Sequence, residues 1–164
     1  MTTISVYSIH SISIRDIRCQ LMNNAMAIFK QFDHIGIVVS DLKKAMDALS
    51  YFFGFECREK MELKEAGIRI AFYPLGEGQM ELIEFSKPMD DVDSIVLEPR
   101  PGVQHVAFQV KNFDKTLQEL TDKGLKVVRG FPRQGAHGKV AFFYPTEGLD
   151  LMIEICESGS EHED

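Results

Sequence analysis

One pattern occurs twice along this chain, and the duplication constrains the fold more than any other feature of the sequence. Each copy begins with a histidine in a strand-like apolar run, His34 in the first copy and His105 in the second. Each copy also ends with a strand-like apolar run that carries one glutamate, Glu81 in the first and Glu154 in the second. Because apolar strands rarely carry polar groups without partners, these four side chains are predicted to meet at one site.

The order of predicted elements is the same in both copies: a strand, a helix and three further strands. In the first copy these are strand 32–39, helix 42–53 and strands 55–63, 68–73 and 79–85. In the second copy they are strand 106–110, a helix between Asn112 and Gly124, and strands 125–128, 139–144 and 149–155. The pattern predicts an α+β fold in which two tandem βαβββ modules form one curved mixed sheet, with helices outside and a cleft within.

This organisation divides the chain into three regions. Residues 30–157 are predicted to form a single domain, with module one at about 30–86, a linker at about 87–101 that includes a short helix, and module two at about 102–157. Residues 1–29 form an N-terminal extension, interpreted as a loose segment before a later start; an Arg- and Ser-rich transit peptide is the alternative. Residues 158–164 form an acidic tail that is expected to fray.

The composition argues against some classes of function. A net charge of −7 disfavours a nucleic-acid surface, because phosphate binding requires clustered Lys and Arg side chains. No apolar run approaches the length of a membrane span. The three cysteines have no metal-motif spacing and leave an odd thiol, which favours a reducing compartment and hence a cytoplasmic protein.

The four repeated side chains are suitable ligands for a divalent metal ion. Imidazole nitrogen and carboxylate oxygen together suit Co²⁺, Ni²⁺, Mn²⁺, Fe²⁺ or Zn²⁺, and four such ligands leave two octahedral positions for a chelating substrate. Taken singly, each residue would more often be a hydrogen-bonded histidine or a solvent-facing glutamate, but the duplication favours the joint interpretation. Glu84 is the alternative to Glu81, because a shift of one residue in strand register exchanges the two faces of the strand.

These motifs resemble those of the vicinal oxygen chelate superfamily, which contains glyoxalases, bleomycin resistance proteins and extradiol dioxygenases. The resemblance covers residues 32–157 and rests on segments 33–39, 72–76, 80–83, 104–108 and 132–139. Within the superfamily the chain looks most like the methylmalonyl-CoA epimerases. The segment Gly135-Ala136-His137-Gly138 is the most specific to them, and the other segments are shared across the superfamily.

The resemblance implies a cleft that contains a metal ion bound by His34, Glu81, His105 and Glu154, with Co²⁺ favoured and Zn²⁺, Ni²⁺, Mn²⁺, Mg²⁺ or Fe²⁺ as alternatives. It also implies epimerisation of an acyl-CoA such as methylmalonyl-CoA, in which an α-proton is removed and returned through a metal-stabilised enolate. By the same resemblance, Glu154 and His137 are catalytic residues and the protein is a homodimer.

Three further residues have two interpretations each. Arg133 and Lys139 are implied to contact CoA phosphates, although composition alone makes them part of a solvated surface. His137 is implied to position a thioester or carboxylate, whereas without the resemblance it would stabilise its glycine-rich loop.

The chain also departs from the epimerase pattern. The family's second acidic base aligns near Ile70, which cannot transfer a proton, and Thr146 stands where a lysine usually follows the proline. A glyoxalase-like lyase or a ring-cleaving dioxygenase of the same superfamily is therefore the second hypothesis. The third is a dimeric protein that binds a small molecule without catalysis.

Overall fold

A computed structural model describes residues 28–86, 92–97 and 100–157 of the chain. Most of the predicted N-terminal extension, parts of the predicted linker and the predicted acidic tail lie outside these ranges. Module one contains β1 (Phe29–Val38), α2 (Leu42–Phe53), β2 (Glu59–Leu63), β3 (Ile68–Leu75) and β4 (Gly78–Phe85). The linker contributes α3 (Ser94–Leu97), and module two contains β5 (Gly102–Val110), α4 (Phe113–Asp122), β6 (Arg133–Gln134), β7 (Lys139–Phe143) and β8 (Met152–Glu157).

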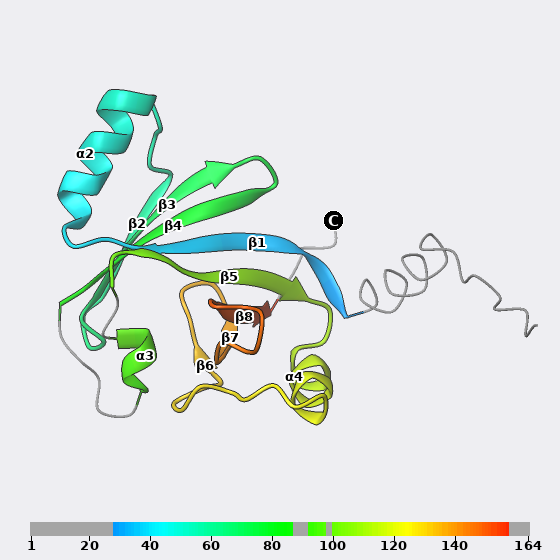
Figure 1. The fold of residues 1–164 in the computed structure, drawn as a ribbon. Coiled ribbons are helices and arrows are strands. Elements are labelled where there is room, and N and C mark those ends of the chain that lie inside the picture. The colour runs from blue at the N-terminus through cyan, green and yellow to red at the C-terminus, as the bar shows by residue number, and fades with distance from the viewer. Residues whose placement is uncertain (1–27, 87–91, 98–99, 158–164) are drawn as a thin grey trace, which may run out of the picture.

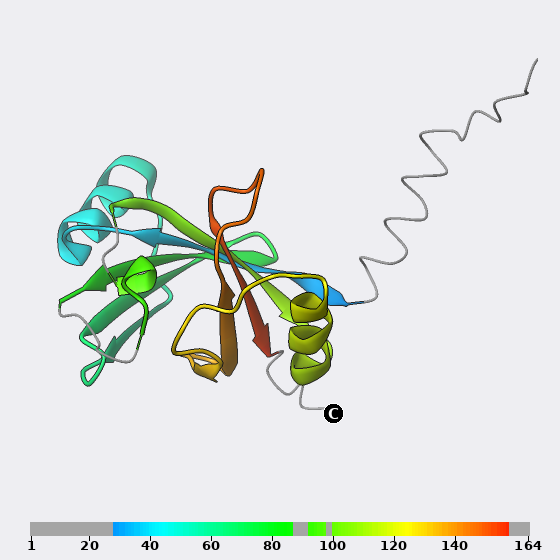
Figure 2. The ribbon, with the colours of Figure 1, turned by 60° about the horizontal axis from the view of Figure 1, so that its bottom comes forward.

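All eight strands form one mixed sheet in the order β2-β3-β4-β1-β5-β8-β7-β6. β1 and β5 pair antiparallel at its centre, and each pairs in parallel with the last strand of its own module, β4 or β8. The sheet curls into a half-barrel with α2 beside module one and α4 beside module two (Figures 1 and 2). The predicted α+β fold of two βαβββ modules is confirmed. Within the described ranges, no helix is long and apolar enough to cross a membrane.

The helices begin where the sequence predicts, because a polar side chain caps each of them. Asp41 accepts a hydrogen bond from the Lys44 amide at the start of α2, and Asn112 accepts one from the Lys115 amide at the start of α4. α2 ends at Gly54, whose φ of 68° is a left-handed conformation that costs glycine little.

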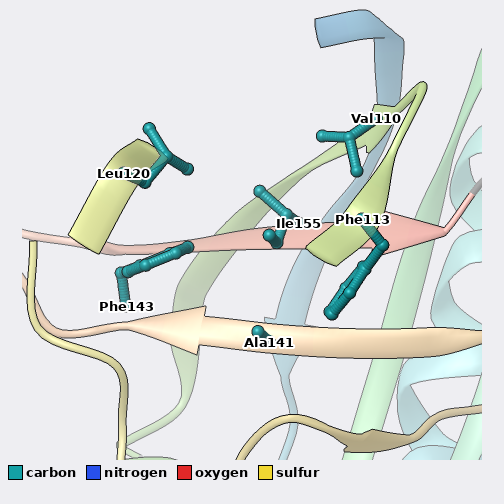
Figure 3. Close-up of a cluster of buried hydrophobic side chains, with 6 residues drawn as sticks. All are labelled: Val110, Phe113, Leu120, Ala141, Phe143 and Ile155. Atoms are coloured by element: carbon teal, nitrogen blue, oxygen red, sulfur yellow. The ribbon is translucent and has the colours of Figure 1, made fainter. Parts of the chain in front are cut away.

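Both helices cover the outer face of the sheet and leave its inner face open. Phe113 and Leu120 of α4 pack on the outer face of the sheet against Val110 of β5, Ala141 and Phe143 of β7 and Ile155 of β8 (Figure 3). Leu42 of α2 packs in the equivalent place against Ala71 and Tyr73 of β3 and Leu82 of β4. Full burial of a large aliphatic or aromatic side chain stabilises a fold by about 1.5–3 kcal/mol, so these clusters hold each helix on its module. Because strand side chains alternate between faces, the residues between the cluster residues point into the cleft.

The prediction of a strand at 125–128 was wrong. In this segment Val127 makes an isolated bridge to Phe143, and the outer strand of module two is β6, which pairs with Lys139 and Val140. The segment remains close to β7, since the Val128 amide donates to the Phe142 carbonyl at 2.8 Å. A short apolar run gives the same pattern whether it pairs along its length or at one point, so the sequence could not separate the two cases.

Candidate metal centre

The inner face of the sheet lines a cleft of about 900 Å³, and four ionisable side chains converge inside it. His34 on β1 and His105 on β5 come from the central antiparallel pair. Glu81 on β4 lies beside Gly36 in register, and Glu154 on β8 lies beside Ala107. All four side chains are buried. The pairing of the two modules therefore brings together the four residues that the duplication marked.

Distances within the group are those of ligands around a single ion. The Nε2 atoms of His34 and His105 are 3.0 Å apart, and Oε2 of Glu154 lies 3.2 Å from each of them. Glu81 Oε2 lies 3.2 Å from His34 Nε2 and 3.7 Å from His105 Nε2. Ligands about 2.1 Å from an ion and at right angles to each other are about 3.0 Å apart. The His34, His105 and Glu154 ligand atoms all lie within 4.8 Å of one another and form a possible metal-binding site, with the Glu81 carboxylate adjacent.

The hydrogen bonds behind the two imidazoles leave both Nε2 lone pairs directed into the cleft. Nδ1 of His34 donates to the Asp33 carboxylate at 2.6 Å. Nδ1 of His105 lies 3.2 Å from Oε1 of Gln104, and this oxygen must be the acceptor because Nε2 of Gln104 donates to the Val96 carbonyl. Two lone pairs and two carboxylates at such short range repel one another unless a cation joins them. The donor set therefore fits a divalent ion.

Protons are the other cations that this cluster can hold. Burial disfavours an imidazolium, but the hydrogen bonds from His34 to Asp33, Glu154 and Glu81 raise its pKa to about 12. Burial likewise opposes charge on Glu81, yet its contacts with His105 and His34 lower its pKa to about 2. The pKa of His105 is raised and that of Glu154 is lowered, against burial, by their mutual hydrogen bond. The site thus strongly favours positive charge at its centre.

Two β-bulges supply residues that the sequence did not predict. The register of β1 and β5 skips Asp33 in one strand and Gln104 in the other, so each is an extra residue immediately before its histidine. A bulge re-aims a side chain, and here both side chains reach their own histidine. Asp33 also accepts a hydrogen bond from Gln109 at 2.5 Å. A polar residue before each histidine was the available signal, but strict strand alternation placed it on the opposite face.

The register also decides between Glu81 and Glu84. Glu84 lies on the outer face, where its Oε2 accepts a hydrogen bond from the Leu42 amide at 2.7 Å and its Oε1 pairs with Arg69. It therefore supports the start of α2 and has no part in the cleft.

The remaining predicted site residues lie in different places. His137 and Arg133 line the cleft. The His137 ring is 4.9 Å from that of Phe72, and its Nε2 is 3.9 Å from Oε2 of Glu59, which also lines the cleft. Lys139 does not line the cleft: its Nζ lies 2.5 Å from Asp114 Oδ1, on the side of α4.

Ile70, where the resemblance aligns an acid, lines the cleft and is 6% exposed. Its cross-strand partner is Ile83, which also lines the cleft. This wall of the cleft is aliphatic.

Known proteins similar to this chain include methylmalonyl-CoA epimerases. The family model for the glyoxalase/bleomycin resistance protein/dioxygenase superfamily matches residues 33–143. The uncharacterized protein YqjC of Bacillus subtilis (strain 168) is 32% identical over 134 residues, which are 80% of this chain and 96% of that protein. The mitochondrial methylmalonyl-CoA epimerase of Bos taurus is 27% identical over 127 residues, 76% of this chain and 73% of that protein.

A solved structure of a methylmalonyl-CoA epimerase is also similar to this chain. A variant of the Streptomyces coelicolor methylmalonyl-CoA epimerase, in complex with 2-nitronate-propionyl-CoA, superposes with a TM-score of 0.68 at 26% identity. The match covers 80% of this chain and 96% of that chain.

Proposed function

This chain belongs to the glyoxalase/bleomycin resistance protein/dioxygenase superfamily, and from that premise we propose that it is a metal-dependent epimerase of an acyl-CoA such as methylmalonyl-CoA. The observation that carries the proposal is the convergence of His34, His105, Glu81 and Glu154 in one buried cluster. Similarity to methylmalonyl-CoA epimerases, one of them bound to 2-nitronate-propionyl-CoA, supports the choice of substrate class.

The four clustered residues would hold the ion, with Glu81 and Glu154 balancing its double charge. A bound divalent ion would act as a Lewis acid that makes the carbon between thioester and carboxylate more acidic, an effect worth several kcal/mol. The cleft supplies an environment in which this effect is strong, because the four ligands are buried and the Phe72 and Phe142 rings flank them.

Glu154 and His137 are the proposed proton-transfer groups. Glu154 accepts the α-proton, the C–H electron pair stays with the substrate, and a proton is returned to the same carbon from the opposite face. His137 is suited to return it, because it lines the cleft from module two and lies beside Phe72 of module one. Arg133 lines the same cleft and would bind an anionic part of the substrate.

Hydrogen–deuterium exchange tests this reaction directly. The protein loaded with Co²⁺ is incubated with methylmalonyl-CoA in D₂O, and mass spectrometry follows deuterium at the α-carbon. We expect exchange that Glu154→Gln abolishes and Glu84→Gln retains, since the second substitution makes the same chemical change on the outer face. Exchange no faster than the uncatalysed background would rule out the epimerase.

A glyoxalase-like lyase is the second candidate, and the aliphatic wall at Ile70 and Ile83 favours it. A lyase needs proton transfer on one face of its substrate only, so the absence of a second acid at position 70 would not prevent its reaction. Exchange with retention of configuration in the deuterium experiment would support this reading over the epimerase.

We also propose that the enzyme is a cytoplasmic homodimer that uses Co²⁺. Tyr51, Phe52 and Phe53 at the end of α2 are 70–83% exposed, and such an aromatic patch is typical of an interface. Both described cysteines, Cys57 and Cys156, are free thiols, as expected in a reducing compartment. Light scattering of protein purified from cells tests the assembly, and a monomer would contradict the proposed homodimer. Metal analysis of the same protein tests the ion, and an ion other than Co²⁺ would contradict the proposed cofactor.

A further inference from the structure

An apolar chamber adjoins the metal ligands at one end of the cleft. Its floor is formed by Ile70 and Ile83, which are directly opposite each other on β3 and β4. Ile83 follows Glu81 by two residues on the same face of β4, a separation of about 7 Å. Both isoleucines are buried yet line the cleft, so the chamber begins two residues along β4 from Glu81.

Val92 and Val96, from the described part of the linker, form the roof of the cleft next to this chamber. Both line the cleft and pack in one cluster with Phe142 and with Phe85, which lies two residues beyond Ile83 on β4. The Phe142 ring lies 5.0 Å from that of His105, and the Val96 carbonyl accepts a hydrogen bond from Gln104 at 2.9 Å. The roof is therefore tied to the metal centre on two sides, which preorganises the chamber.

The pseudo-equivalent end of the cleft has a different chemistry. In module two, β7 and β8 place Val140 opposite Cys156 where module one has Ile70 opposite Ile83. Val140 pairs on its other side with Arg133, which also lines the cleft. Duplication gave the two ends the same strand pattern, but the β3–β4 pair presents two isoleucines to the cleft, whereas the β7–β8 pair presents a valine and a thiol beside Arg133. The charged lining of module one comes from the β2 side of the cleft and includes Arg58, Glu59 and Glu62. A bound molecule would therefore have a preferred orientation.

Building on the proposed function, we propose that the chamber binds the substituent on the reacting carbon and that this substituent is an apolar chain longer than methyl. The substrate class is then a 2-alkyl malonyl-type thioester, with its alkyl group between Ile70, Ile83 and Val96 and its charged groups toward the ligands and Arg133. An acid at position 70 would have to be desolvated beside such a chain, which explains why an isoleucine suits this site.

Binding of substituted malonates tests the proposal. The series malonate, ethylmalonate, butylmalonate and hexylmalonate is titrated calorimetrically into the full chain, with and without Co²⁺. The slope of affinity against chain length reports the chamber, and we expect up to about fourfold tighter binding for each added carbon. The change in malonate affinity on adding Co²⁺ reports the metal centre. If affinity rises with chain length as expected but Co²⁺ does not change malonate affinity, the proposed metal-dependent function is refuted while the proposal of an alkyl-binding chamber is retained.

Two variants place the effect in the chamber. Ile70→Gln should flatten the slope, and Val96→Phe should fill the space and weaken hexylmalonate at least tenfold relative to malonate measured in the same variant. Ile95→Gln is the matched control, because Ile95 is 37% exposed on the same helix and does not line the cleft. A flat slope in the unmodified protein, or a slope unchanged in Val96→Phe, would overturn the proposal. Circular dichroism checks that each variant is folded.

Discussion

Replacing Gly36 with alanine should abolish metal binding through a single methyl group. Gly36 lies opposite His105 in the central strand pair. A Cβ added at Gly36 would lie 2.0 Å from Cε1 and 2.3 Å from Nε2 of the His105 ring. Ordinary contacts of a Cβ begin at 3.4 Å, so the ring would have to move by the difference, about 1.4 Å.

Such a movement exceeds what a metal site tolerates. Ligand distances are held to within about 0.2 Å, and His105 is 1% exposed with the Phe142 ring 5.0 Å away, so it has little room to adjust. We expect the affinity for a divalent ion to fall by more than about 100-fold. The strand itself accepts alanine, and overpacking should cost only about 1–3 kcal/mol of unfolding free energy.

Calorimetric titration with Co²⁺, together with urea unfolding, measures both effects of Gly36→Ala. Ala107→Gly is the control, because Ala107 is the residue opposite His34 and loses a methyl group there. The control should bind the ion with nearly unchanged affinity. A folded Gly36→Ala variant with the affinity of the unmodified protein would show that the His105 ring does not bind the ion in the position described.

Three further changes probe the surroundings of the site. Asp33→Asn weakens the acceptor of the His34 Nδ1 hydrogen bond and should lower Co²⁺ affinity by about 10–100-fold, as measured by calorimetry; equal affinity would contradict an orienting role. Glu84→Gln loses a charged acceptor for the Leu42 amide and should destabilise the fold by about 1 kcal/mol in urea unfolding, with no change in ion affinity. Removal of the ion by a chelator should lower Tm, since an ion at 100 times its Kd stabilises the folded state by about 2.7 kcal/mol; a Tm that does not respond to the chelator would argue against a resident ion.

The sequence by itself determined the architecture and marked the four side chains that the fold brings together. Strand and helix periods, the caps at Asp41 and Asn112, and the duplication predicted two βαβββ modules, and these depend on local signals that any single copy carries. The parity of residues along a strand put Glu81 and Glu84 on opposite faces of β4, because side-chain direction within one strand is a local property, but the strand register decided which of the two faces the cleft.

Only the tertiary structure decided how residues from different strands meet. The two bulges are mismatches between β1 and β5, so the contacts of Asp33 and Gln104 with their histidines depend on pairing that no single segment encodes. The same holds for Lys139, which lies toward α4, and for the aliphatic chamber, which needs β3, β4 and the linker side by side. Non-local pairing sets these positions, because a shift of one residue in register would move every side chain to the opposite face.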